Sequence, residues 1–283
     1  MLMFQNLLVK VLQNILSIVK VSRPKGWRAY LWMSFLGYID GAKNFVFDTL
    51  FIYALISYLA TAFAVNNLFD IKSDSLNKAK SNPLVSGYCK KIHVYALLVN
   101  QAIALLLLLL LKREVFSMYL ALCFLGIAYS VPPLRLKGKP LLDVLSHTLF
   151  FGALLYLYGF FYTKAALQSS YWYKVALIML YSAFLQLRNL RDDVEYDMCA
   201  GDRTTFVVFP NASRIVLNSL GVIIPFLCVL VFLGLTNYIL EGIFLITVVS
   251  AVIGYKWGWD RFVDSFVVAS LSLHSLYVLL TTV

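Results

Sequence analysis

The sequence predicts an all-α integral membrane protein with nine transmembrane helices. Its composition, its apolar runs and the distribution of its basic residues each support this fold class. Of the 283 residues, 61% are hydrophobic and 13% are charged. An ordinary soluble domain contains about 45–50% apolar and about 25% charged residues. The composition therefore excludes a soluble globular domain.

Nine apolar runs are long enough to cross a bilayer, which takes about 20 mostly apolar residues in a helix. We expect the spans at 28–45, 48–68, 92–111, 115–131, 141–162, 172–190, 214–236, 238–256 and 262–283. The remaining residues are too few for a separate soluble domain, so residues 1–283 are expected to form a single membrane domain. Within it, residues 1–25 are expected to form an interfacial N-terminal helix, because the stretch from Val9 to Lys20 is basic and amphipathic, a pattern that fits such a helix better than a cleavable signal peptide.

Basic residues alternate between the expected loops. Of the 24 Lys and Arg residues, 19 lie in the N-terminal segment and in every second loop, and five lie in the other loops. Loops rich in Lys and Arg stay in the cytoplasm, so we expect a cytoplasmic N-terminus and an external C-terminus in the cell membrane. Contact of these loops with anionic membrane lipid also explains the net charge of +10, and no nucleic-acid partner is needed.

Two acidic clusters lie at the cytoplasmic ends of expected spans. Asn66, Asp70 and Asp74 end the second span, and Asp193 and Asp197 end the sixth. Residues four apart share one face of a helix. The C-terminal end of a helix disfavours anions, so a cation should offset these carboxylates. That cation is either Lys or Arg, in a solvated acidic loop, or Mg²⁺, which binds carboxylates together with water and phosphate oxygens.

Basic residues in the same loops favour the second interpretation. Arg135 and Lys137 follow the twin prolines after the fourth span, Arg203 follows Gly201, and Arg23 precedes the first span. Arg and Lys both bind phosphate, Arg through a fork of donors and Lys as a point charge. Each residue alone is also explained as a topology anchor. Two acidic clusters with basic residues on one face suit two metal ions that clamp a diphosphate.

Three motifs occur in order at the ends of expected helices. They are Asn66-x-x-x-Asp70-x-x-x-Asp74, Tyr129-Ser-Val-Pro-Pro-Leu-Arg135-Leu-Lys137 and Asp193-x-x-x-Asp197-x-x-x-Gly201-Asp202-Arg203-Thr204. With the nine expected spans, these motifs resemble the UbiA family of intramembrane prenyltransferases over nearly the whole chain.

The resemblance implies nine helices around a central, lipid-accessible cavity with cytoplasmic cap loops. It implies a Mg²⁺-dependent transfer of a polyprenyl group from a prenyl diphosphate to a lipophilic acceptor, with release of diphosphate. The catalytic residues would be Asp70, Asp74, Asp193 and Asp197, and these together with Asn66 would hold Mg²⁺. The residues expected to contact the substrate are Arg23, Lys78, Tyr129, Arg135, Lys137 and Arg203.

One segment departs from the family pattern. Many members carry Arg between the first acidic motif and the following proline, where this chain has Ser75, Asn77 and Asn82 with Lys78 and Lys80. Either Lys78 or Lys80 replaces those arginines, or the acceptor differs from that of the quinone-pathway members. Aromatic acids, glyceryl lipids, carotenoid ends and tetrapyrroles all remain open as acceptors.

Two other functions are consistent with a polar membrane protein. Phosphoribosyl transfer to a polyprenyl phosphate would also use Mg²⁺ and a diphosphate leaving group. A secondary transporter would place its binding charges near the bilayer midplane in broken helices, whereas these carboxylates lie at helix ends. The sequence therefore favours the prenyltransferase.

The topology is testable with a reporter fused after Val283. The split of basic residues predicts that this reporter behaves as an external domain, while a reporter fused within residues 81–90 behaves as a cytoplasmic one. A cytoplasmic signal after Val283 would mean an even number of spans.

Overall fold

A computed structural model describes residues 2–44, 46–77, 81–166, 168–233 and 258–281, and every regular element among them is helical. The chain divides into two compact units. Unit 1 contains residues 1–28, 48–135 and 195–202, and unit 2 contains residues 29–47, 136–194 and 203–283.

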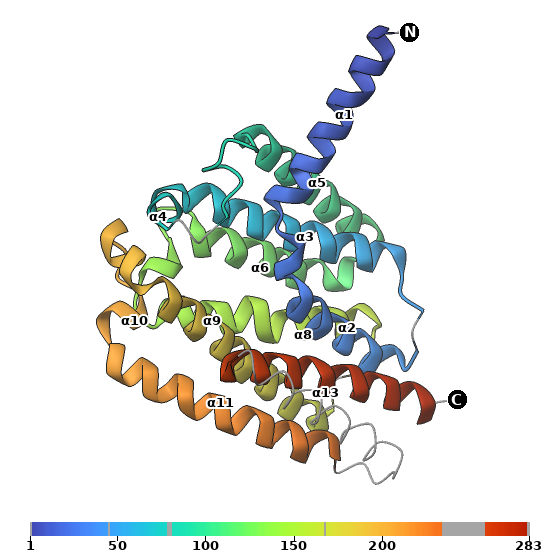
Figure 1. Ribbon diagram of the computed structural model, residues 1–283. Coiled ribbons are helices and arrows are strands. Elements are labelled where there is room, and N and C mark those ends of the chain that lie inside the picture. Colours follow the sequence, from blue (N-terminus) through green and yellow to red (C-terminus); the bar gives the residue numbers. More distant parts are fainter. Residues whose placement is uncertain (1, 45, 78–80, 167, 234–257, 282–283) are drawn as a thin grey trace. The chain divides into compact units, whose positions relative to one another are not determined.

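Unit 1 is built around α3 (Thr49–Phe69), which packs against α5 (Lys91–Leu111) and α6 (Arg113–Ser130) (Figure 1). Its other helices are α1 (Leu2–Val21), the short 3-10 helix η1 (Pro24–Gly26) and α4 (Ile71–Leu76). The Asp48 side chain caps α3 by accepting a hydrogen bond from the Leu50 backbone N–H at 2.8 Å. Such a cap satisfies one of the donors that the first turn of a helix leaves without a partner.

Buried polar side chains connect the three central helices of unit 1. The Gln101 Nε2 donates to the Tyr119 hydroxyl at 2.7 Å, and that hydroxyl donates to the Ala54 carbonyl at 2.7 Å. Hydrogen bonds between apolar helices add specificity where lipid provides no hydrophobic force between them. Along α5, many apolar side chains are instead exposed, including Ile92, Val99 and Leu110.

The N-terminal segment forms the helix expected for it. The end of α1 is anchored in unit 1, where Cys89 Sγ donates to the Ser17 carbonyl and Asn67 Nδ2 to the Val21 carbonyl. Earlier residues of α1, such as Leu12 and Leu16, are exposed and apolar. Its location in the membrane interface stays a prediction.

Unit 2 contains the remaining helices. They are α2 (Arg28–Ala42), η2 (Leu136–Gly138), α7 (Leu142–Thr148), the π-helical turn η3 (Leu149–Ala153), α8 (Leu154–Tyr162), η4 (Ser169–Tyr171), α9 (Trp172–Ala200), α10 (Thr205–Val208), α11 (Pro210–Leu233) and α13 (Trp259–Thr281). The last residues of α9, from Glu195, belong to unit 1. Helices α11 and α13 pack side by side.

Two glycines let α2 and α8 approach until their backbones touch. A Cβ atom on Gly37 would lie 1.9 Å from the Tyr156 carbonyl oxygen, and one on Gly159 would lie 2.0 Å from the Ser34 carbonyl oxygen. Small residues at such crossings are typical of helix packing in membranes. Any side chain at either position would separate the two helices.

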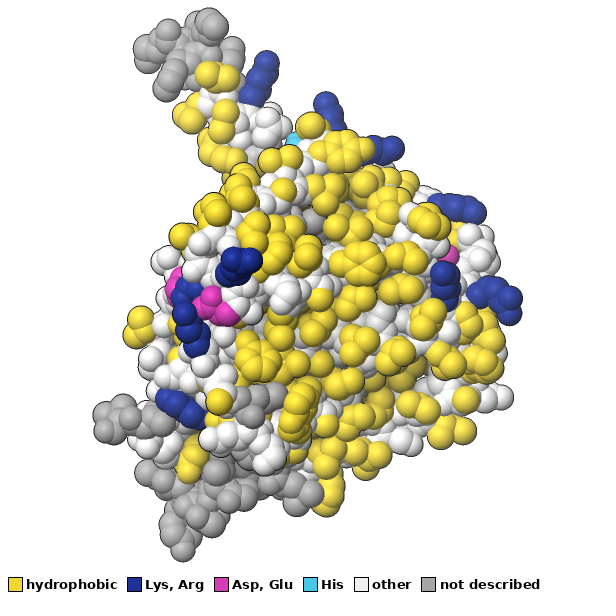
Figure 2. All heavy atoms as spheres, turned by 180° about the vertical axis from the view of Figure 1, so that it is seen from behind, with side chains coloured by type: hydrophobic (Ala, Val, Ile, Leu, Met, Phe, Trp, Pro, Cys, Tyr) yellow, Lys and Arg dark blue, Asp and Glu magenta, His cyan; other side chains and the backbone are white. Residues whose placement is uncertain are grey.

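Helices occupy eight of the nine predicted spans, and the span expected at 238–256 lies outside the described residues. Five segments of the described chain are long and apolar enough to cross a bilayer: Thr49–Phe69, Lys91–Leu111, Leu142–Tyr162, Pro210–Cys228 and Trp259–Thr281. Figure 2 shows one face on which hydrophobic side chains predominate. These features support an integral membrane protein.

A buried charge cluster connects four helices of unit 2. Lys174 on α9 donates to Asp40 Oδ1 on α2 at 2.7 Å, and Tyr156 on α8 donates to Asp40 Oδ2 at 2.8 Å. His274 Nε2 on α13 lies 2.8 Å from the Lys174 Nζ and 3.3 Å from Asp40 Oδ1. Asp40 and Lys174 are 1% and 5% exposed, so their charges depend on each other.

Replacing this lysine tests the cluster. We expect Lys174→Met to destabilise the protein by about 3–5 kcal/mol, because it leaves the buried Asp40 carboxylate without its ammonium partner. Thermal unfolding in detergent measures the change, with Lys139→Met, at an exposed lysine of the same unit, as the control. Equal unfolding temperatures for the two variants would contradict the pairing.

Candidate functional site

The first acidic motif lies where α3 ends. Asp70 closes the helix, with its backbone N–H donating to the Asn66 carbonyl at 3.0 Å, and the Asp74 N–H donates to the Asp70 carbonyl at 2.8 Å. The motif is therefore divided between α3 and α4, but its turn-by-turn spacing is preserved. Asp70 and Asp74 are 7% and 5% exposed. Two carboxylates are thus buried where α3 ends and α4 begins: Asp70 closes α3, and Asp74 lies in the first turn of α4.

Asparagines hold this motif in place. Asn82 Nδ2 donates to Asp74 Oδ2 at 2.9 Å and to the Asn67 carbonyl at 2.8 Å. Asn67 Oδ1 accepts from Arg23 Nη1 at 3.3 Å. Asn66 donates through Nδ2 to the Ser130 hydroxyl at 3.3 Å, so its amide oxygen is the atom that could bind a metal ion. Of the other predicted residues, Arg23 is thus placed beside the motif in unit 1.

Arg135 connects the ends of two helices to the loop after α9. Its Nε and Nη2 donate to the two carboxylate oxygens of Asp202 at 3.0 and 2.7 Å. Its Nη1 donates to the Phe69 carbonyl on α3 at 3.3 Å and to the Ser130 carbonyl on α6 at 3.4 Å. Its Nη2 also lies 3.9 Å from Asp70 Oδ1. A cation at the C-terminal ends of two helices is favoured by both helix dipoles.

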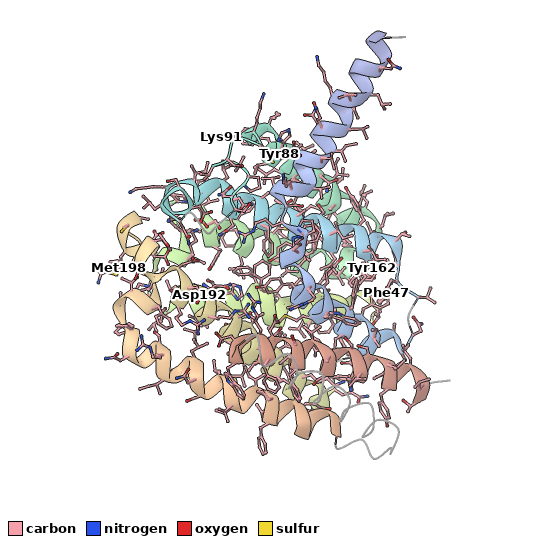
Figure 3. All side chains as sticks on the ribbon, in the orientation of Figure 1. Phe47, Tyr88, Lys91, Tyr162, Asp192 and Met198 are labelled. Carbon is pink, nitrogen blue, oxygen red and sulfur yellow. The ribbon has the colours of Figure 1, made fainter. Side chains whose placement is uncertain are left out.

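The second acidic motif lies within α9 and not beyond its end. The helix continues to Ala200, past Asp193 and Asp197, both of which are half-buried. Figure 3 shows Asp192 and Met198 on this last part of α9. Asp193 belongs to unit 2 and Asp197 to unit 1. The i, i+4 spacing of the two carboxylates on one helix is confirmed.

Two predicted phosphate ligands lie on neighbouring loops of unit 2. The Arg203 backbone N–H donates to the Gly138 carbonyl at 3.2 Å, which places Arg203 next to the turn η2 that carries Lys137. Arg203 is exposed and Lys137 half-buried. Tyr129 is half-buried in the last turn of α6, in unit 1. Lys78 and Lys80 lie outside the described residues.

A model of the UbiA prenyltransferase family matches residues 29–270. The chain belongs to the UbiA prenyltransferase family. It is therefore a transferase of prenyl groups, as the three motifs predict.

Solved structures share the fold. The chain is similar to a UbiA homologue from Archaeoglobus fulgidus bound to DMAPP and Mg²⁺, with a TM-score of 0.67 and 20% identity over 93% of this chain and 99% of that one. An apo UbiA homologue from Aeropyrum pernix gives a TM-score of 0.65 at 17% identity over 92% and 99% of the two chains.

Curated relatives of this UbiA member align with a smaller part of the chain than the solved structures do. The chain is 26% identical over 193 residues to a lycopene elongase/hydratase of Corynebacterium glutamicum, covering 66% of this chain and 67% of the relative. It is 31% identical over 140 residues to a lycopene elongase/hydratase of Haloarcula japonica, covering 47% and 48% of the two chains.

The first acidic motif has a donor set that suits Mg²⁺. It offers two carboxylates and one amide oxygen, and Mg²⁺ is usually held by one or two carboxylates with water and phosphate oxygens completing the shell. Within the described ranges, no three Asp, Glu, His or Cys side chains converge in a metal-binding arrangement. The assignment of Asn66, Asp70, Asp74, Asp193 and Asp197 as metal ligands therefore stays a prediction.

Sequence analysis alone did not identify Asn82 and Asp202 as site residues. Asn82 stood out only as a departure from the usual arginines, and Asp202 only as a member of the third motif. The structure gives both a direct partner in unit 1, Asp74 and Arg135. Gly201 is the feature of the sequence that points to Asp202. Its φ of 86° is a conformation that favours glycine; it ends α9, and the Asp202 backbone N–H then donates to the Asp197 carbonyl.

The Asn82 contact can be tested by truncation. We expect Asn82→Ala to lower the free energy of unfolding by about 1–3 kcal/mol, because the buried Asp74 carboxylate loses a hydrogen-bond donor. Ser75→Ala, at an exposed residue of α4, is the matched control. A thermal unfolding curve in detergent that is the same for both variants would show that Asn82 does not support Asp74.

Proposed function

We propose that this UbiA member is an intramembrane, Mg²⁺-dependent enzyme that transfers a prenyl group from a prenyl diphosphate to a lipophilic acceptor and releases diphosphate. The observation that carries the proposal is the burial of Asp70 and Asp74 where α3 ends and α4 begins, with the Arg135 guanidinium beside Asp70. Buried carboxylates are unfavourable unless cations or hydrogen-bond donors face them. In a prenyltransferase those cations bind the diphosphate.

The acidic residues would bind the metal. We assign Asn66, Asp70 and Asp74 in the first motif, and Asp193 and Asp197 in the second, to Mg²⁺. The bound ions neutralise the negative charge that develops on the departing diphosphate. Hard oxygen ligands and the family of the chain support this assignment.

The basic residues would bind the diphosphate. Lys137 and Arg203 lie on neighbouring loops of unit 2 and offer a point charge and a forked donor. Tyr129, Arg23 and Lys78 complete the predicted set. In unit 1, Asp202 holds the Arg135 guanidinium so that its charge faces Asp70. Arg135 thus stabilises the first motif and supplies positive charge next to it.

The apolar helices would exclude water from the reaction. We propose that nine spans with a cytoplasmic N-terminus enclose a lipid-accessible cavity, where the isoprenoid tail binds. A dry site strengthens each electrostatic contact and protects an allylic cation from hydrolysis. The five apolar segments of the described chain support this arrangement.

Among the open acceptor classes, we propose a carotenoid end. The relatives named lycopene elongase/hydratase support this choice, and the neighbour bound to DMAPP supports a short prenyl donor. The acceptor and donor are then tested in one assay.

The assay combines the purified protein in lipid nanodiscs with Mg²⁺, dimethylallyl diphosphate and lycopene, and mass spectrometry detects the prenylated product. We expect Asp70→Asn to lower the rate by about 10²–10³-fold, because it removes a charged ligand of the Mg²⁺ that would neutralise the departing diphosphate. EDTA should abolish the wild-type reaction and added Mg²⁺ should restore it. Ser75→Ala, at the exposed residue that follows the motif on α4, serves as the control.

Different failures contradict different parts of the proposal. Full activity of a folded Asp70→Asn variant, or activity indifferent to EDTA, would overturn the metal mechanism. Product formed with an aromatic acid instead of lycopene would overturn the acceptor alone. Consumption of phosphoribosyl diphosphate with a polyprenyl phosphate, and none of prenyl diphosphate, would overturn the donor.

A further inference from the structure

Polar side chains connect α9 and α13 at intervals along both helices of unit 2. At one end of α9, Lys174 Nζ lies 2.8 Å from His274 Nε2. Further along, the Tyr181 hydroxyl donates to Asp264 Oδ1, and Arg188 Nη1 lies 3.9 Å from Asp264 Oδ2. Nearest the acidic motif, Arg191 Nη2 lies 2.7 Å from Asp260 Oδ2. Residue numbers rise along α9 as they fall along α13, so the two helices run antiparallel.

The α9 side of these contacts forms a single stripe. Lys174, Tyr181 and Arg188 follow one another at intervals of seven residues. Seven residues make nearly two full turns of an α-helix, so each side chain is rotated by only about 20° about the helix axis from the one before it. Lys174 and Tyr181 are 5% and 0% exposed. The face of α9 that carries this stripe is therefore fixed towards α13 by contacts distributed over several turns. Rotation of α9 about its own axis would break all of them.

The second acidic motif points away from this stripe. Asp193 follows Arg188 by five residues, so its side chain is rotated by about 140° about the helix axis from that of Arg188. It follows Arg191 by two residues, a rotation of about 200°. Asp197 lies one turn beyond Asp193 on the same side. Any contact that fixes the stripe against α13 also fixes the direction of the acidic motif.

The two ion pairs nearest the motif also control the charge beside it. Arg191 is held by Asp260 and by Asp192, whose Oδ1 accepts from Nε at 3.0 Å and from Nη2 at 2.8 Å (Asp192 is labelled in Figure 3). Asp260 lies in the first turn of α13, where the helix dipole favours an anion. The contact with Asp260 thus fixes the Arg191 guanidinium against the first turn of α13, and the contact with Asp192 holds it on α9.

We propose that Asp260 and Asp264 of α13, through Arg191 and Arg188, are positioning residues for the second acidic motif. They set the rotation of α9 within unit 2 and so the direction in which Asp193, the first residue of the motif, presents its carboxylate to a divalent cation. This inference rests on the proposed metal role of that motif. Helix α13 contains none of the three family motifs, and this inference gives it a role in building the site.

The test measures Mn²⁺ binding by electron paramagnetic resonance, with the full chain in lipid nanodiscs and in the presence of a prenyl diphosphate. We expect Asp260→Asn and Arg191→Gln each to weaken Mn²⁺ binding by about 10-fold, a typical effect of losing a partner that orients a metal ligand. The exchanged pair Arg191→Asp with Asp260→Arg should restore binding. Arg214→Gln, at an exposed arginine on α11, should leave binding unchanged.

The outcomes separate this inference from the proposed function. Asp193→Asn is measured in parallel, and thermal unfolding shows that each variant is folded. Weaker binding in Asp193→Asn with wild-type binding in Asp260→Asn and Arg191→Gln would overturn the positioning role only. Loss of binding in both single variants without recovery in the exchanged pair would overturn it too. Unchanged Mn²⁺ binding in Asp193→Asn would overturn the metal role of the motif itself.

Discussion

A buried carboxylate needs a partner, and this constraint organises both units of the protein. Four aspartates are buried in the described chain, and each has a donor or cation beside it. Asp40 binds Lys174, Asp70 lies beside Arg135, Asp74 accepts from Asn82, and Asp143 accepts from Thr205. Removing one partner of a buried pair typically costs more than the pair contributes. Each aspartate therefore commits the elements around it to one arrangement.

The two acidic motifs are stabilised by different means. The first motif is held locally, by hydrogen bonds from Asn82 and by the Arg135 fork that reaches the ends of α3 and α6. The second motif lies on a continuous helix, so its orientation depends on the rotation of all of α9. A substitution near the first motif should remove one or two hydrogen bonds to it. A substitution along α9 should instead change the rotation of the whole helix and with it the direction of the second motif.

Hydropathy predicted the positions of the described helices well, and contacts between distant residues could not be predicted from it. The third span, expected at 92–111, is the helix Lys91–Leu111. The sixth, expected at 172–190, continues to Ala200, because hydropathy detects only the apolar part of a helix, and α9 ends only before Gly201, whose φ is 86°. The fork from Arg135 to Asp202 joins residues 67 positions apart, and no local pattern encodes such a pairing. The polar stripe of Lys174, Tyr181 and Arg188 likewise gives no local indication that α13 is the helix it contacts.

The Asp40 cluster has a consequence for biogenesis. Asp40 precedes Lys174 by 134 residues and His274 by 234 residues. At a synthesis rate of about 5–20 residues per second, roughly 7–27 s pass before the lysine follows the aspartate out of the ribosome. An unpaired carboxylate is costly in lipid. In the proposed nine-span arrangement, α2 must therefore wait beside the insertion machinery, or carry the Asp40 carboxyl group protonated, until α9 arrives to complete the pair.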